Sequence, residues 1–94
     1  AEGVKIVGEA HNGTEALELA QDLLPDAMII DLYMPDMNGL DVIRQIRKQL
    51  PTIRTVLVSS YWDKVYERLL AAEGSGTFIP KARLSTQTLL RALR

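Results

Sequence analysis

Three polar residues of complementary chemistry, Asp31, Ser59 and Lys81, each stand at the end of a short apolar run. A carboxylate can act as a nucleophile on phosphorus. A hydroxyl can hydrogen-bond a phosphoryl oxygen, and an ammonium group can neutralise another. If the fold brings these three side chains together, the chemistry they suit is phosphoryl transfer, for which a hard divalent cation is usually needed as well.

The runs that carry these residues predict buried strands. Residues 27–31 and 55–59 are apolar at consecutive positions, as strands covered on both faces are, and residues 77–80 form a shorter run. Residues 4–10 predict a further strand at the start of the chain. Between the strands, apolar residues recur at helical spacing. The predicted helices cover residues 14–24, the segment from Leu40 to Leu50, residues 62–73, and the C-terminal segment with Ser85 or Thr86 as its N-cap.

This alternation of strand and helix predicts an α/β domain with a parallel sheet, right-handed crossovers and helices on both faces. Ligands of such sheets lie outside the carboxyl ends of the strands. We therefore expect Asp31, Ser59 and Lys81 to meet at one rim.

Composition limits the alternatives. The chain has 94 residues, 47% of them hydrophobic, with a net charge of −1 and no cysteine. This predicts one small domain without disulfides, and the charge argues against a broad nucleic-acid footprint. No run is long enough for a membrane span and no signal peptide is visible, so we expect a cytoplasmic domain without membrane contact.

The segments around these residues resemble a known family. Pro25-Asp26 before Ile30-Asp31, then Met34-Pro35-Asp36-Met37-Asn38-Gly39, together with Ser59 and the stretch Gly76-Thr77-Phe78-Ile79-Pro80-Lys81, are similar to the phosphorylation site of response-regulator receiver domains. The resemblance covers essentially the whole chain. It implies the flavodoxin-like (CheY-like) doubly wound fold, in a style closest to the NarL/FixJ subfamily, which carries a LuxR-type output domain.

The resemblance also implies roles. Asp31 would accept a phosphoryl group, Ser59 and Lys81 would bind it, and Ser59 and Phe78 would act as the switch. Mg²⁺ would bind Asp31 and the backbone carbonyl of Tyr33, and Pro35 and Gly39 would shape the loop.

The implied function is a two-component phosphorelay switch, not a turnover enzyme. A sensor histidine kinase would be the phosphodonor, and the output, outside this chain, would be DNA binding and transcription regulation. The last strand and last two helices would form the changed surface and a homodimer face.

One departure concerns the start of the chain. The match over residues 1–94 begins at the family's second strand, so the family's first strand, first helix and acidic metal-binding pair have no counterpart, and Glu2 is in the wrong place to replace the pair. The segment was not recorded, was deleted, or is supplied by another chain.

Two rival readings remain. The first is a truncated or degenerate receiver that works as a phosphorylation-independent interaction module. The second is a phosphatase or transferase with an aspartyl nucleophile, but such enzymes place a second Asp two residues on, where this chain has Tyr33.

Overall fold

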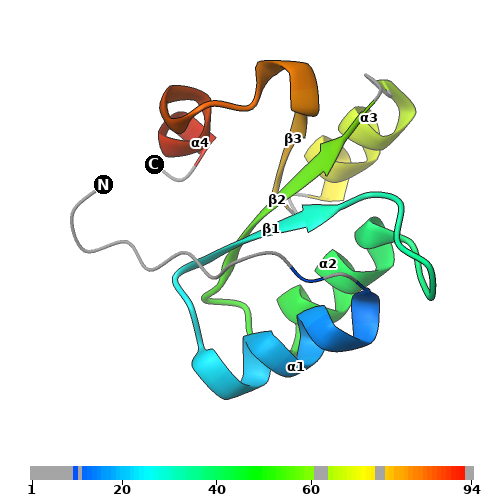
Figure 1. Cartoon of the computed structure of the whole chain (residues 1–94), viewed down its shortest axis with the longest axis vertical. Coiled ribbons are helices and arrows are strands. Elements are labelled where there is room, and N and C mark those ends of the chain that lie inside the picture. Colours follow the sequence, from blue (N-terminus) through cyan, green and yellow to red (C-terminus); the bar gives the residue numbers. More distant parts are fainter. Residues whose placement is uncertain (1–9, 11, 61–63, 74–75, 93–94) are drawn as a thin grey trace.

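A computed structural model describes residues 10, 12–60, 64–73 and 76–92 of the chain. Helices and strands alternate along it (Figure 1). Their bounds are α1 Gly13–Leu23, β1 Ala27–Asp31, α2 Gly39–Gln49, β2 Arg54–Ser59, α3 Lys64–Glu73, β3 Thr77–Pro80, a short 3-10 helix Lys81–Arg83, and α4 Thr86–Ala92. This order confirms the predicted α/β class.

The strands of the described residues form one parallel sheet in the order β1-β2-β3. Asp31 lies beside Val58 on the neighbouring strand, and Ser59 lies beside Pro80. Because the strands run in the same direction, their carboxyl ends share one edge of the sheet. The strand predicted over residues 4–10 falls, apart from Ala10, outside the described residues.

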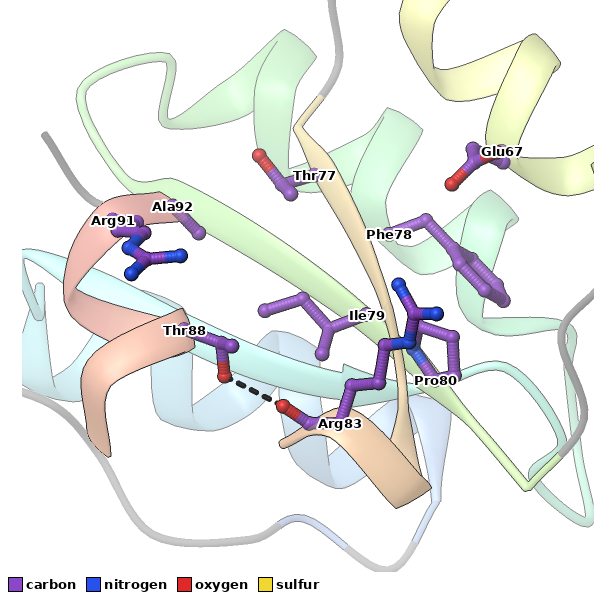
Figure 2. Close-up of a pocket in the computed structure, with 9 residues that line it drawn as sticks. All are labelled: Glu67, Thr77, Phe78, Ile79, Pro80, Arg83, Thr88, Arg91 and Ala92. Carbon is purple, nitrogen blue, oxygen red and sulfur yellow. Dashed lines mark hydrogen bonds between the residues drawn. The ribbon is translucent and has the colours of Figure 1, made fainter. Parts of the chain in front are cut away.

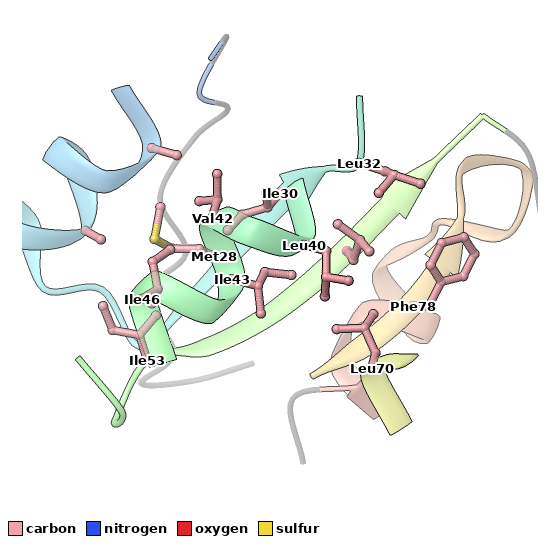
Figure 3. Close-up of a cluster of buried hydrophobic side chains, with 13 residues drawn as sticks. Met28, Ile30, Leu32, Leu40, Val42, Ile43, Ile46, Ile53, Leu70 and Phe78 are labelled. Carbon is pink, nitrogen blue, oxygen red and sulfur yellow. The ribbon is translucent and has the colours of Figure 1, made fainter. Parts of the chain in front are cut away.

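Successive strand residues point to opposite faces, and each face has its own core. On one face the strands pack against α1, α2 and α3 (Figure 3), with buried strand residues Met28, Ile30, Leu57 and Phe78. On the other face Ala27, Val56, Val58 and Ile79 form a smaller cluster against Leu89 and Ala92 of α4. Helices thus cover both faces, as a doubly wound sheet requires.

The end of α1 differs by one residue from the prediction. The helix ends at Leu23, and Leu24 has a left-handed backbone with φ 44°. Pro25 explains the stop, because a residue before proline is disfavoured in the α-helical region. Helical spacing predicts Ala16, Leu17, Ala20, Leu23 and Leu24 on one side of this helix. Leu23 and Leu24 are exposed, and the fully buried side chains of α1 are Ala16 and Ala20.

Helical spacing predicts Trp62, Val65, Tyr66, Leu69 and Leu70 on one side of the helix, but only part of that side is buried in α3. Leu70 is buried and Tyr66 is half-buried, but Val65 and Leu69 are 65% and 38% exposed. The helix therefore contacts the core along a line of residues one turn apart. The predicted first residue of this helix, Trp62, lies outside the described residues.

The last helix has the predicted cap. The Ser85 hydroxyl accepts a hydrogen bond from the Thr88 N–H at 3.1 Å, and the Thr88 hydroxyl accepts one from the Ser85 N–H at 2.9 Å. This reciprocal arrangement satisfies N–H groups that the first turn leaves without a helical partner. No helix in the described part of the chain is long and apolar enough to cross a membrane.

Candidate functional site

The fold brings Asp31 and Lys81 together at the carboxyl edge of the sheet. Asp31 is the last residue of β1, and Lys81 follows β3 directly. The Lys81 Nζ lies 2.9 Å from the Asp31 Oδ2, and the Tyr33 N–H donates to the Asp31 Oδ1 at 3.1 Å. Each carboxylate oxygen therefore has its own partner. The Asp31 side chain is 33% exposed, which leaves it accessible to a reactant.

Ser59 ends the strand between them and is fully buried. Its side chain faces the same side of the sheet as Leu57, two residues earlier. Phe78 pairs with Leu57 in the register and is itself buried, at 7% exposure. Ser59 and Phe78 thus lie on the same face of neighbouring strands. Ser59 is two residues further along β2 than Leu57, which pairs with Phe78.

The loop after Asp31 closes tightly on its own strand. Tyr33 and Asn38 form an isolated antiparallel bridge, and the Gly39 N–H donates to the Leu32 carbonyl at 2.8 Å. A Cβ on Gly39 would lie 2.9 Å from the Leu32 Cα and from the Asp31 carbonyl carbon, so only glycine fits without a shift. The sequence prediction assigned loop shaping to Gly39, and the structure gives its physical reason.

Asp36, in the same loop, holds the start of α1. Its carboxylate accepts hydrogen bonds from the N–H groups of Gly13 at 2.7 Å and Thr14 at 3.0 Å, and from the Thr14 hydroxyl at 2.9 Å. The Gly13 and Thr14 hydrogen bonds, in that order, hold the pKa of Asp36 below its ordinary value of 3.8. Asn12 completes the cap by accepting from the Glu15 N–H.

Asn38 joins the loop to two helices. Its Oδ1 accepts from the Leu40 N–H at 2.8 Å and caps α2, while its Nδ2 donates to the Tyr66 hydroxyl of α3 at 2.9 Å. Sequence reasoning did not predict this link or the Asp36 link. Asn38 directly before a helical pattern is a signal for the cap, but partners this far away in sequence leave no local signal.

The described residues do not complete a divalent cation site. Asp31 and the Tyr33 carbonyl are the ligands that the resemblance implies, and no group of three or more acidic or histidine side chains that could hold a metal lies within the described residues. Mg²⁺ usually binds one or two carboxylates together with water and phosphate oxygens.

A hollow of about 500 Å³ lies beside β3, on the surface predicted to change (Figure 2). It is lined by Glu67 of α3 on one side and by Thr88 and Arg91 of α4 on the other. Arg83 contributes a second cationic side chain, and its carbonyl accepts from the Thr88 hydroxyl at 2.8 Å. The hollow is therefore lined by residues of β3, among them Phe78 and Ile79, and by charged side chains from the neighbouring helices.

Together, the fold and this rim define a doubly wound α/β domain whose sheet edge presents a carboxylate beside an ammonium group. Residues 1–94 match the response regulator receiver domain, and the chain belongs to this family. It is the receiver domain of a two-component response regulator.

Among sequence relatives, the chain is 41% identical over 80 residues to a protein-glutamate methylesterase/protein-glutamine glutaminase of Alkalilimnicola ehrlichii, covering 84% of this chain and 20% of that protein. The chain spans 20% to 35% of the length of the first curated relatives that it matches. Methylesterase activity is named for that relative as a whole.

Among solved structures, the chain is similar to a Burkholderia pseudomallei response regulator with a phosphorylated aspartic acid and a calcium ion. The TM-score is 0.80 at 25% identity, over 94% of this chain and 51% of that one. It also resembles the receiver domain of the response regulator NarL from Mycobacterium tuberculosis, with TM-score 0.76 at 29% identity over 93% and 73% of the two chains. The latter agrees with the subfamily that the sequence suggested.

Proposed function

We propose that this chain accepts a phosphoryl group on Asp31 from a sensor histidine kinase and changes an interaction surface as a result. The observation that carries the proposal is the 2.9 Å contact between the Lys81 Nζ and the Asp31 Oδ2 at the carboxyl edge of the sheet. The match of residues 1–94 to the receiver-domain family supports this assignment. We propose that these residues are one receiver domain that aligns with the family from its second strand onward.

The reaction is an in-line transfer. An Asp31 carboxylate oxygen attacks phosphorus, the bond from phosphorus to the kinase's histidine nitrogen breaks, and the bonding electrons stay with that nitrogen. The product on this chain is an acyl phosphate. Lys81 then pairs with a phosphoryl oxygen instead of the carboxylate, and the Ser59 hydroxyl donates to another.

The negative charge of the transferred phosphoryl group has to be neutralised by a cation, and we propose that this cation is Mg²⁺. Asp31 and the Tyr33 carbonyl would be its ligands from the described residues. The phosphorylated Burkholderia pseudomallei relative holds a calcium ion, which supports a divalent cation in this family. The remaining carboxylates would come from outside the described residues, and without them the domain would work as a phosphorylation-independent interaction module.

The switch would act through Ser59 and Phe78. Engagement of the buried Ser59 by the phosphoryl group changes the packing on the face that it shares with Phe78, and β3 lies between α3 and α4. The surface of β3, α3 and α4 would then pair with a second receiver or with an output domain. A DNA-binding response regulator of the LuxR family from Staphylococcus aureus is structurally similar to this chain, which supports a DNA-binding output that regulates transcription.

Phosphorylation of the full-length protein with a small phosphodonor and Mg²⁺ tests the proposal. The wild-type protein should become labelled, Asp31→Asn should not, and the control Asp22→Asn, an exposed acid on α1, should label as the wild type does. Label that survives in Asp31→Asn would contradict the assignment. Absence of label in the wild-type protein would favour the interaction module.

A further inference from the structure

A side-chain hydrogen bond joins the loop after Asp31 to helix α3. The Asn38 Nδ2 donates to the Tyr66 hydroxyl at 2.9 Å, and the bond is partly buried. The two residues lie on segments that the sheet brings together, since Asn38 precedes α2 and Tyr66 lies in the first half of α3. This bond offers a path from the site to α3 that avoids Ser59 and Phe78.

The loop end of the path is fixed to the candidate phosphorylation site. The Tyr33 N–H donates to the Asp31 carboxylate, and Tyr33 forms the antiparallel bridge with Asn38. The Gly39 N–H, next to Asn38, donates to the Leu32 carbonyl. A displacement of the Asp31 carboxylate or of the Tyr33 backbone therefore reaches Asn38 through two direct contacts.

At the helix end of the path, few apolar side chains of α3 are buried. Within the described residues of α3, Leu70 is the one buried side chain, and Tyr66 is half-buried against the same core. Val65 and Leu69 are exposed. Because α3 buries few apolar side chains, we expect the Asn38–Tyr66 bond to contribute to holding the helix in place.

We propose that Tyr66 is a positioning residue that couples the phosphorylation state of Asp31 to helix α3 through Asn38. The inference rests on the proposed function. In the unphosphorylated structure the Asn38–Tyr66 bond holds α3 against the loop. Phosphorylation shifts Tyr33 and Asn38, weakens the bond and frees α3 to change how it presents Val65 and Leu69 to a partner.

Two substitutions remove the bond. Tyr66→Phe keeps the ring in the core and deletes the hydroxyl. Asn38→Ser keeps a side-chain oxygen that can cap α2, but the shorter side chain cannot reach Tyr66. Gln21→Ala is the control, because it deletes an exposed side-chain hydrogen bond between α1 and α2, from the Gln21 Nε2 to the Gln49 Oε1 at 3.0 Å.

The experiment measures amide hydrogen exchange of the α3 peptide in the full-length protein, before and after phosphorylation with a small phosphodonor and Mg²⁺. In the wild-type protein we expect phosphorylation to raise exchange in residues 64–73 about fivefold, the effect of losing one net hydrogen bond. Tyr66→Phe and Asn38→Ser should show the raised exchange already without phosphorylation, and phosphorylation should add little. Gln21→Ala should keep the wild-type response.

If the role of Tyr66 were purely structural, Tyr66→Phe and Asn38→Ser would raise exchange in α3 by the same factor in the unphosphorylated and in the phosphorylated protein. That result would overturn the coupling. Unchanged or reduced exchange in α3 of the phosphorylated wild-type protein would overturn it too. Labelling of Asp31 is recorded in the same samples. Labelled protein without the predicted exchange pattern refutes only the role of Tyr66, whereas a wild-type protein that does not label refutes the proposed function on which it rests.

Discussion

Gly39→Ala should destabilise the protein although it replaces a helix glycine. At an unstrained helix position this change gains about 0.4–1 kcal/mol, because alanine restricts the unfolded chain. At Gly39 the new Cβ would lie 2.9 Å from two backbone atoms of Asp31 and Leu32, and the Asp31 carbonyl oxygen is closer still. The Leu32 N–H is fixed by a 2.8 Å hydrogen bond to the Val58 carbonyl, so the strand end cannot easily move away.

The clash therefore has to be relieved by moving the start of α2, and overpacking of this kind costs roughly 1–3 kcal/mol. Gly13→Ala is the matched control, since Gly13 is also the first residue of a helix. Its Cβ would meet the Met37 Cγ first, the Met37 Sδ at 2.6 Å and the Val42 Cγ2 at 3.1 Å. All three are side-chain atoms, and the flexible side chain of Met37 can rotate away, whereas the contacts of Gly39 are with backbone. We expect Gly13→Ala to change the free energy of unfolding by no more than about 1 kcal/mol.

Urea unfolding of the purified full-length protein compares the free energy of unfolding of the two variants. Hydrogen exchange of amides in β1 and β2 is a second measure of the same difference. Gly39→Ala should be the less stable by about 1–3 kcal/mol. Its Asp31 should also label more slowly with a small phosphodonor, because the shift of α2 moves the loop that orients the carboxylate. A Gly39→Ala protein as stable as Gly13→Ala would refute the reasoning from backbone contact.

Further predictions concern the site and its loop. Lys81→Ala should slow labelling of Asp31 by at least roughly tenfold, while the free energy of unfolding changes by no more than about 1 kcal/mol, because the ion pair is partly exposed; an unchanged labelling rate would remove Lys81 from the site. Tyr33 is 59% exposed beside Asp31, and Tyr33→Ala should hydrolyse the acyl phosphate faster if the ring shields it from water, whereas an equal lifetime would exclude shielding. The hydrogen bonds from Gly13 and Thr14 lower the pKa of Asp36 below 3.8, so their stabilisation is full above that pH and is lost as the pH falls through the folded-state pKa. Asp36→Asn should reduce the loss of stability that urea unfolding measures between neutral pH and about pH 3. An identical loss in the variant would show that other groups cause it.

The elements that carry the site were predictable because each depends on a short segment. The apolar runs define β1 and β3 to the residue, and β2 begins only one residue before its predicted start. Ser85 was predictable as a cap, since its partner is three residues away. The 3-10 helix from Lys81 was not predicted, because the segment after β3 has no periodic apolar pattern.

The features that sequence reasoning missed depend on distant partners. Asp36 holds Gly13, and Asn38 holds Tyr66, across segments whose proximity only the packed sheet and helices create. Which apolar residues of α3 are buried could not be predicted for a related reason. Helical periodicity shows which residues share a side of a helix, but how much of that side is covered depends on the neighbouring elements.

The ion pair between Asp31 and Lys81 also has a consequence for how the protein is made. Synthesis places Asp31 in the chain long before Lys81, and the two meet only after β3 has paired with β2 and β2 with β1. Contacts between such distant residues form late, because their loop-closure entropy must be offset by the pairing of the strands between them. In a nascent chain Asp31 therefore lacks the ammonium group of Lys81. The ion pair is present only where β3 has joined β2 in the sheet.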